Sequence, residues 1–196
     1  MADLGAGHLS GLTEADPAWE AAWAPYDEAT YQAALAALRP TDVVLDLGAG
    51  DLRFARQAAR RCRRVIAIER RLPLLRAAGP WPANLWPVCA DLRQWHWPPG
   101  VTVGVLLMRH CRRFAEYAAG LRAAGAGRLI TNARWGLGVE VIDLEAPRRP
   151  FAEAAGRWYA CACGAAGFAP GPPGALDEQA LDQMVEVRAC PRCEPP

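Results

Sequence analysis

The sequence predicts an α/β fold with a doubly wound, mostly parallel sheet, helices on both faces and a small β-rich extension at the carboxyl end. First, a short apolar run leads into the glycine turn Gly48-Ala49-Gly50 and then into an Ala- and Arg-rich stretch with helical spacing. Second, apolar runs and helical stretches alternate up to about residue 132, as in right-handed βαβ units. Third, the last part of the chain changes to closely spaced strand-like runs.

Length and composition limit the classes of protein to consider. The 196 residues suffice for one well-packed domain with an appendage, and 52% hydrophobic residues supply enough apolar surface to fold it without disulfides. The 22 basic and 21 acidic side chains nearly cancel, so net charge predicts no long-range attraction to nucleic acid or membrane. Every basic residue is arginine, which keeps phosphate binding open and excludes lysine chemistry such as Schiff bases.

The chain is expected to be cytoplasmic and to have no membrane partner. It contains no run of about 18 apolar residues and no charged leader followed by an apolar run. Seven cysteines without such a leader fit a reducing compartment, where clustered cysteines more often bind a metal than form disulfides.

The elements follow in order from the spacing of apolar residues. Residues 1–40 are expected to form an N-terminal helical segment, with one helix from Asp16-Pro17 to about residue 38. In the α/β domain, residues 41–145, strands are predicted at residues 41–47, 65–68, 85–89, 101–108 and 128–132, and helices at residues 52–61, 72–78 and 114–124. After residue 135, strands are predicted at 139–144, 157–162 and 184–189 and a helix at 176–181, and residues 146–196 are expected to complete the sheet.

The glycine turn discriminates between cofactors. Ligands of open parallel sheets bind at the carboxyl ends of the strands, where Gly48 and Gly50 let a ligand approach the backbone. A dinucleotide fingerprint would have a third small residue where this chain has Arg53, and a phosphate loop would end in Gly-Lys-Ser/Thr, which is absent. Both phosphate-binding alternatives, including a nicotinamide oxidoreductase, are therefore disfavoured.

The run Val-Leu-Asp-Leu-Gly-Ala-Gly-Asp at residues 44–51 resembles the first motif of class I S-adenosylmethionine-dependent methyltransferases. The resemblance covers about residues 42–132 and implies a Rossmann-like methyltransferase fold. It implies that Glu69 accepts both ribose hydroxyls and that Asp91 lies near the adenine; where the family usually has a third glycine, this chain has Leu52. The implied cofactor-binding residues are Asp46, Gly48, Ala49, Gly50, Glu69, Arg70, Ala90, Asp91, Leu92 and Met108.

Catalytic candidates follow the fourth and fifth strands. His110 is a candidate base because an imidazole titrates near neutral pH, and the alternative is that it packs under the next helix. Asn132 is a second candidate, for which turn chemistry is the alternative. The Asp/Asn-Pro-Pro-Tyr/Phe motif of amino-methylating nucleic acid enzymes is absent, which counts against exocyclic adenine or cytosine nitrogen as the acceptor. Tyr26 and Tyr31 could close over the cofactor or belong to an amphipathic helix.

Four cysteines in the tail form two close pairs. Cys161-Ala-Cys163 and Cys190-Pro-Arg-Cys193 each follow a predicted strand, which is how two knuckles present four thiolates to one tetrahedral zinc ion. Four thiolates leave no open position, so the zinc would be structural. A redox dithiol at Cys190 and Cys193, or unrelated thiols, are the alternatives.

Together these observations predict an S-adenosylmethionine-dependent methyltransferase with a structural zinc knuckle. RNA is slightly favoured over protein or a small molecule as the acceptor. Arginine pairs such as Arg60-Arg61 and Arg63-Arg64 could make a phosphate-tracking surface, but a solvated helix face is the simpler interpretation. The alternative function is a non-catalytic cofactor- or nucleic-acid-binding module that retains the fold. The sequence leaves the oligomeric state open.

Overall fold

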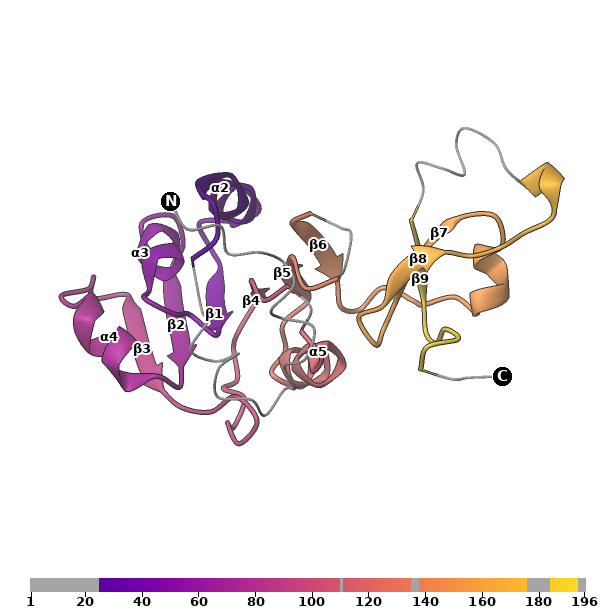
Figure 1. Cartoon of the computed structure of the whole chain (residues 1–196). Helices are drawn as coiled ribbons and strands as arrows, with labels where there is room; N and C mark the ends of the chain where they lie inside the picture. Colours follow the sequence, from indigo (N-terminus) through magenta and orange to yellow (C-terminus); the bar gives the residue numbers. More distant parts are fainter. Residues whose placement is uncertain (1–24, 110, 135–137, 176–183, 194–196) are drawn as a thin grey trace, which may run out of the picture.

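The computed structural model describes residues 25–109, 111–134, 138–175 and 184–193, which form two sheets (Figure 1). The strands of the six-stranded sheet are β1 (Val43–Leu47), β2 (Arg64–Glu69), β3 (Leu85–Cys89), β4 (Val103–Leu106), β5 (Arg128–Thr131) and β6 (Glu140–Asp143). The helices packed on this sheet are α2 (Glu28–Ala36), α3 (Arg53–Ala59), α4 (Leu72–Ala78) and α5 (Phe114–Ala123).

The strand order of the large sheet confirms the predicted doubly wound α/β fold. The order is β3-β2-β1-β4-β5-β6; β1 to β5 are parallel, and β6 is antiparallel to β5. The chain runs outward from β1 on one side and starts again at β4 on the other. The order therefore reverses between β1 and β4, and in such sheets the ligand crevice lies outside the carboxyl ends of the strands at this switch point.

Two apolar cores cover the two faces of the large sheet. Val44 of β1 packs in the core that contains Phe54 of α3, and the next residue, Leu45, packs in the core that contains Leu121 of α5. On the α5 face, a Cβ on Gly104 would lie 2.3 Å from Cδ1 of Leu121, so only glycine lets the helix approach β4 this closely. None of the described helices is long and apolar enough to cross a lipid bilayer.

Most predicted elements are present with small changes at their ends. The predictions for β3 and α4 coincide with the structure, whereas β4 is shorter than the predicted residues 101–108. Asp27 caps α2, because its Oδ1 accepts a hydrogen bond from the N–H of Thr30 at 2.8 Å. The predicted helix start at residue 16 and the predicted helix at 176–181 lie outside the described residues.

The tail forms a sheet of its own. Its elements are η2 (Phe151–Ala154), β7 (Trp158–Cys161), β8 (Ala166–Phe168), η3 (Pro173–Ala175) and β9 (Met184–Val187), and its strand order is β8-β7-β9. The expectation that residues 146–196 complete the large sheet is wrong, since β6 occupies the free edge of β5 in antiparallel register. The tail strands pair with one another instead, and β8 was missed because three residues carry no clear periodicity.

The outer strand β3 has a proline at its centre. Pro87 pairs in register with Ala67 of β2, and the N–H of Ala90 donates to the carbonyl of Glu69 at 3.2 Å. Because successive backbone groups of a strand point to opposite sides, the nitrogen of Pro87 faces away from β2. The neighbouring Trp86 is exposed, with the guanidinium of Arg64 4.0 Å from the centre of its ring.

Candidate cofactor site and metal centre

The glycine turn is fixed to the carboxyl end of β2. The N–H groups of Gly48 and Ala49 both donate to the carbonyl of Ile68 at 2.9 Å. Gly48 and Gly50 have φ values of 74° and 57°, which favour glycine. A Cβ on Gly48 would lie 3.0 Å from Cε of Met108, so the methionine packs directly against the turn. The turn is therefore held on one side by β2 and covered on another by Met108.

Leu52, at the position of the family's usual third glycine, takes the left-handed conformation that a glycine would take. Its φ is 63°, it precedes the first residue of α3, and its side chain is fully buried in the core on the α3 face. The left-handed conformation costs a non-glycine residue about 1–2 kcal/mol, whereas full burial of a leucine contributes about 1.5–3 kcal/mol. Burial thus offsets the backbone cost, which explains how leucine is tolerated here.

Asp46 is a buried carboxylate at the switch point. Its side chain is 3% exposed, and Oδ2 has no hydrogen-bond partner among the described residues. Burial, and then the charge of Glu69, raise the pKa of Asp46 to about 7. The recess that Asp46 lines is also lined by Tyr26, Tyr31, Gly48, Ala49, Gly50, Asp51, Arg53, Phe54 and Leu107. An unpartnered carboxylate in such a place fits a cationic ligand.

At the end of each of the strands β1, β2 and β3, or shortly after it, lies an acid that pairs with an arginine two positions later. The pairs are Asp51 with Arg53, Glu69 with Arg71 and Asp91 with Arg93. In each pair the arginine donates to the carboxylate both through its backbone N–H, at 3.2, 2.9 and 2.9 Å respectively, and through its guanidinium. The carboxyl edge of the sheet therefore carries three short acid-X-Arg pairs that were not predicted, although their spacing is visible in the sequence.

Hydrogen bonds keep two of these acids ionised. Glu69 is 3% exposed, and burial alone would raise its pKa, but hydrogen bonds from Arg71 and from the N–H of Gly50 at 2.9 Å outweigh burial and lower the pKa. The hydrogen bond from Arg93 lowers the pKa of Asp91 to about 2. Both groups are therefore carboxylates at neutral pH and can accept hydrogen bonds from a ligand.

Two tyrosines close one side of the recess. The N–H of Arg109 donates to the hydroxyl of Tyr26 at 2.8 Å, and the N–H of Tyr26 donates to the hydroxyl of Tyr31 at 3.0 Å. The guanidinium carbon of Arg109 also lies 5.3 Å from the ring centre of Tyr26. Tyr31 belongs to α2 and Arg109 follows β4, so these contacts join the segment before the sheet to the end of β4.

The remaining predicted residues are distributed around the same edge. Ala90, Leu92 and Met108 are partly buried and pack against the core on the α5 face, and Arg70 is exposed. His110 lies outside the described residues, so its role stays a prediction. Asn132 is 2% exposed, and neither atom of its amide has a hydrogen-bond partner among the described residues.

Solved structures with a similar arrangement include methyltransferases. The 23S rRNA methyltransferase ErmE is 23% identical with a TM-score of 0.48, over 56% of this chain and 47% of that chain. The cyclopropane synthase MmaA2 from Mycobacterium tuberculosis is 18% identical with a TM-score of 0.45, over 53% and 41%. Phosphoethanolamine N-methyltransferase 1 from Haemonchus contortus, solved with phosphoethanolamine and S-adenosylhomocysteine, is 17% identical with a TM-score of 0.45, over 56% of this chain and 26% of that chain.

This chain thus spans less than half the length of each of these three structures. No protein-family model matches the sequence, and no curated protein matches it.

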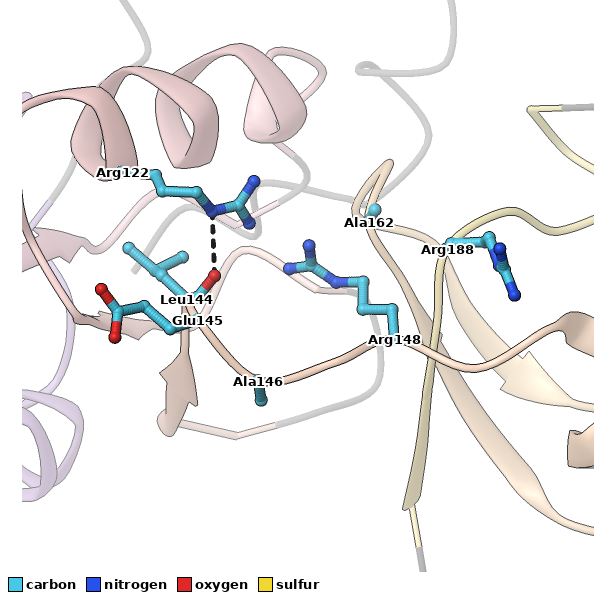
Figure 2. Close-up of a pocket in the computed structure, with 7 residues that line it drawn as sticks. All are labelled: Arg122, Leu144, Glu145, Ala146, Arg148, Ala162 and Arg188. Carbon is cyan, nitrogen blue, oxygen red and sulfur yellow. Dashed lines mark hydrogen bonds between the residues drawn. The ribbon is translucent and has the colours of Figure 1, made fainter.

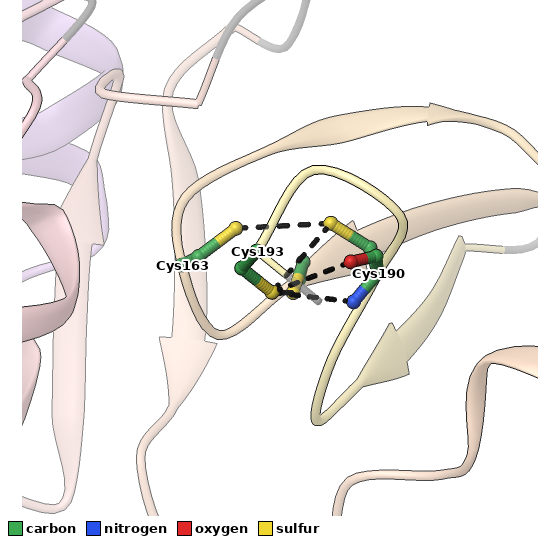
Figure 3. A group of neighbouring side chains, drawn as sticks. Cys163, Cys190 and Cys193 are labelled. Atoms are coloured by element: carbon green, nitrogen blue, oxygen red, sulfur yellow. Dashed lines mark hydrogen bonds between the residues drawn. The ribbon is translucent and has the colours of Figure 1, made fainter. Parts of the chain in front are cut away.

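The four tail cysteines converge on one point between two turns (Figure 3). Their sulfur atoms all lie within 4.8 Å of one another. Cys161 is the last residue of β7, and Cys190 lies three residues after the end of β9; the parallel pairing of these two strands places their ends side by side. The glycine after Cys163, Gly164, has a φ of 93° and donates its N–H to the carbonyl of Cys161 at 2.9 Å, which closes the first turn.

The sulfur separations match a tetrahedral metal shell and not a disulfide. Sγ of Cys161 lies 3.7 Å from that of Cys193, and Sγ of Cys190 lies 3.8 Å from that of Cys163 and 3.9 Å from that of Cys193. Four sulfurs about 2.3 Å from one zinc ion at tetrahedral angles would be about 3.8 Å apart, whereas a disulfide bond measures about 2.05 Å. The geometry therefore fits a four-thiolate metal centre.

Proposed function

We propose that the chain is an S-adenosylmethionine-dependent methyltransferase whose cofactor binds at the carboxyl edge of β1 and β4. The observation that carries this proposal is the buried, unpartnered Oδ2 of Asp46, which lines the recess at the switch point. S-adenosylmethionine has an ammonium group and ribose hydroxyls but no phosphate. It therefore suits a site that has buried carboxylates and lacks a phosphate-binding sequence.

Different residues at this edge would bind different parts of the cofactor. Asp46 would bind the ammonium group, and the glycine turn would let the methionine part approach the backbone. Glu69 would accept hydrogen bonds from the ribose hydroxyls in exchange for part of its contact with Arg71. Asp91 would lie at the adenine, with Ala90 and Leu92 beside it.

The cofactor supplies an activated methyl group, which leaves the sulfonium by in-line displacement. Alignment of the acceptor and exclusion of water can supply much of the rate of such a step. Asn132, buried with a free amide at the end of β5, is the described residue that we propose to position the acceptor. His110 is proposed as a base where the acceptor must lose a proton.

Calorimetry with S-adenosylhomocysteine tests the role of Asp46. Because the pKa of Asp46 is about 7, most molecules carry a proton there at pH 6. A ligand ammonium that pairs with the carboxylate must displace this proton, so binding should release protons at pH 6. The release is measured as a dependence of the binding enthalpy on the ionisation enthalpy of the buffer. It should vanish in Asp46→Asn, and release that persists in this variant would reject the assignment of Asp46.

Replacement of Glu69 tests the ribose contact. Glu69→Ala removes a charged acceptor, so affinity for S-adenosylhomocysteine should fall by about 1.5–3 kcal/mol, or roughly 10- to 150-fold. Glu153→Ala is the matched control, since Glu153 is an exposed acid on η2. Thermal unfolding of both variants shows whether the fold is retained. Unchanged affinity in a folded Glu69→Ala variant, or competition by NAD, would contradict the proposal.

RNA is proposed as the acceptor, ahead of protein or a small molecule. Support comes from the composition, since all 22 basic residues are arginines, which bind phosphate bidentately. Cofactor with a labelled methyl group should label an RNA fraction. Asn132→Ala should keep cofactor affinity and lose turnover. If the cofactor binds and no RNA, protein or small-molecule fraction accepts the label, the non-catalytic binding module is the correct function.

We also propose that Cys161, Cys163, Cys190 and Cys193 hold one structural zinc ion. The tail core contains few large side chains, and Cys161 and Cys190 themselves belong to it. Metal binding would therefore contribute a large share of the folding free energy of the tail.

Metal analysis should give about one zinc per chain with tetrahedral sulfur ligation near 2.3 Å. In Cys161→Ser the zinc should be lost and the tail beyond Trp158 should become protease-sensitive, while the large sheet still binds the cofactor. Cys89→Ser is the matched control, because Cys89 is an exposed thiol outside the cluster. A metal-free chain with a protected tail would refute the zinc proposal.

A further inference from the structure

A hollow lined by arginines lies between the two sheets, away from the proposed cofactor site (Figure 2). Its volume is about 380 Å³, and its lining residues are Arg122, Leu144, Glu145, Ala146, Arg148, Ala162 and Arg188. The N–H of Leu144 donates to the carbonyl of Gly127 at 2.9 Å, immediately before β5 begins. The hollow is therefore beside the amino end of β5, whereas the cofactor crevice lies at the carboxyl ends of the strands.

Two guanidinium groups face each other across this hollow. Nε of Arg122, in the last turn of α5, donates to the carbonyl of Leu144 at 2.9 Å, which fixes the direction of the side chain. Figure 2 shows the guanidinium of Arg148 directed toward that of Arg122, while Arg188, at the far side, points away. The side chain of Arg148 is 15% exposed, and its Nε is buried with no hydrogen-bond partner among the described residues.

Arg148 makes only a long ion pair with a neighbouring carboxylate, that of Glu186. Oε2 of Glu186 lies 3.8 Å from its Nε, which is too long for a hydrogen bond, and Oε1 of Glu186 is bound by Arg134 at 2.7 Å. Glu145 lines the hollow from an exposed position. Burial, together with the charges of Arg122 and Arg134, lowers the pKa of Arg148 even though Glu186 acts in the opposite direction. Arg148 is thus a largely buried cation at the hollow whose carboxylate neighbour Glu186 is shared with Arg134.

We propose that this hollow is a second ligand site, which binds a phosphate group between Arg122 and Arg148. Two guanidinium groups that face each other across a hollow repel each other, and an anion between them removes this cost. A phosphate oxyanion matches the planar fork of a guanidinium and can accept hydrogen bonds from both side chains at once. The phosphate can belong to an RNA backbone or be a free phosphate. The site does not depend on the proposed cofactor.

Titration of the full chain at constant ionic strength tests this site. The probes are inorganic phosphate and, separately, a single-stranded RNA of about 12 nucleotides. Arg122→Gln and Arg148→Gln should each weaken binding of the responsive probe roughly tenfold or more, because each removes a charge-assisted contact. Arg148→Lys, which keeps the charge and loses the fork, should give an intermediate loss. Arg76→Gln, an exposed arginine on α4, is the matched control and should bind as the wild type does.

The outcomes distinguish the sources of the phosphate. RNA binding that both variants lose and that inorganic phosphate displaces assigns the site to a nucleic acid backbone. Phosphate binding that both variants lose, without RNA binding, assigns the site to free phosphate. If neither probe binds the wild type, or if the folded variants bind as the wild type does, the proposal is overturned. Affinity for S-adenosylhomocysteine should be the same in all these variants, so failure here leaves the proposed methyltransferase untouched.

Discussion

Asp46 makes the stability of the chain depend on pH. Its pKa is raised from an ordinary value near 4 to about 7 in the folded state. The folded chain therefore keeps a proton that the unfolded chain loses, and the stability that this proton contributes is lost as the pH rises from about 4 to 7. A difference of about three pKa units corresponds to a loss of up to about 4 kcal/mol, which stays constant at higher pH.

Asp46→Asn should therefore be more stable than the wild type at pH 8, while the two should differ little near pH 4. The difference in melting temperature between them, measured across this range, should grow with pH up to about 7 and then level off. Asp91→Asn is the control, because the pKa of Asp91 is held at about 2 and its contribution does not change between pH 5 and 8. A stabilisation by Asp46→Asn that is independent of pH would contradict the raised pKa.

The location of a candidate site residue could be predicted from the sequence where it depends only on the position of that residue along a strand. Asp46, Glu69 and Asp91 end or follow apolar runs, and parallel strands bring such ends to one edge. Whether the hydrogen-bond partners of these acids could be predicted differs from one acid to the next. The pairing of Asp91 with Arg93 is local and can be read from the spacing of the two residues. That Oδ2 of Asp46 has no hydrogen-bond partner among the described residues depends on burial by distant segments and could not be predicted.

At the scale of elements, Arg134 connects the two sheets. Its side chain is 2% exposed, and it pairs with Glu140 of β6 and, at 2.7 Å, with Glu186 of β9. Its guanidinium carbon also lies 6.0 Å from the ring centre of Phe114 in α5. One side chain thus contacts the large sheet, its helix and the tail, so its loss should affect the packing of all three.

Arg134→Ala should lower the free energy of unfolding by about 3–5 kcal/mol, because it leaves two carboxylates without their cation in a partly buried place. Amide hydrogen exchange should become faster in β7 and β9. Arg149→Ala is the control: Arg149 pairs with Glu153 at 3.5 Å on the surface, and such a pair contributes less than about 1 kcal/mol. Equal losses in the two variants would show that Arg134 has no special role between the sheets.

The tail shows where prediction from the sequence ends. Strand positions at β7 and β9 followed from the apolar pattern, but their partners did not, because a pattern of period two says which face is buried and not which strand lies alongside. The parallel pairing of Trp158–Cys161 with Met184–Val187 joins segments far apart in the chain. The spacing of the cysteines is a local signal that can be read from the sequence. The strand pairing that brings the two cysteine pairs together is not local and could not be predicted.

At the scale of the whole molecule, the described residues form three apolar cores of unequal size. The two cores of the large sheet contain many large buried side chains, whereas the tail core consists largely of alanine, valine and cysteine. Because apolar burial scales with side-chain area, the tail is expected to unfold before the large sheet when the proposed zinc ion is absent.

Among the described residues, the outer edge of β3 offers few backbone donors. Of the backbone N–H groups that face outward, that of Leu85 is bound by the carbonyl of Pro82 at 3.0 Å, and Pro87 has none. Pro87→Val would restore an outward N–H and add a residue with high strand propensity, so it should increase concentration-dependent aggregation. Light scattering at increasing protein concentration measures the effect, and Pro170→Val, at an exposed position of the tail, is the control. Identical scattering of all three proteins would exclude this role of Pro87.

Pro87 therefore has a consequence for the chain before it has finished folding. While β2 and β3 pair and the helices are not yet packed, the apolar strands of many nascent chains are exposed to one another in the cell. A strand that offers few donors on its free side is a poor template for intermolecular β-pairing and for the cross-β stacking that follows from it. We therefore expect Pro87, a residue with no part in the proposed chemistry, to disfavour cross-β stacking of newly made chains.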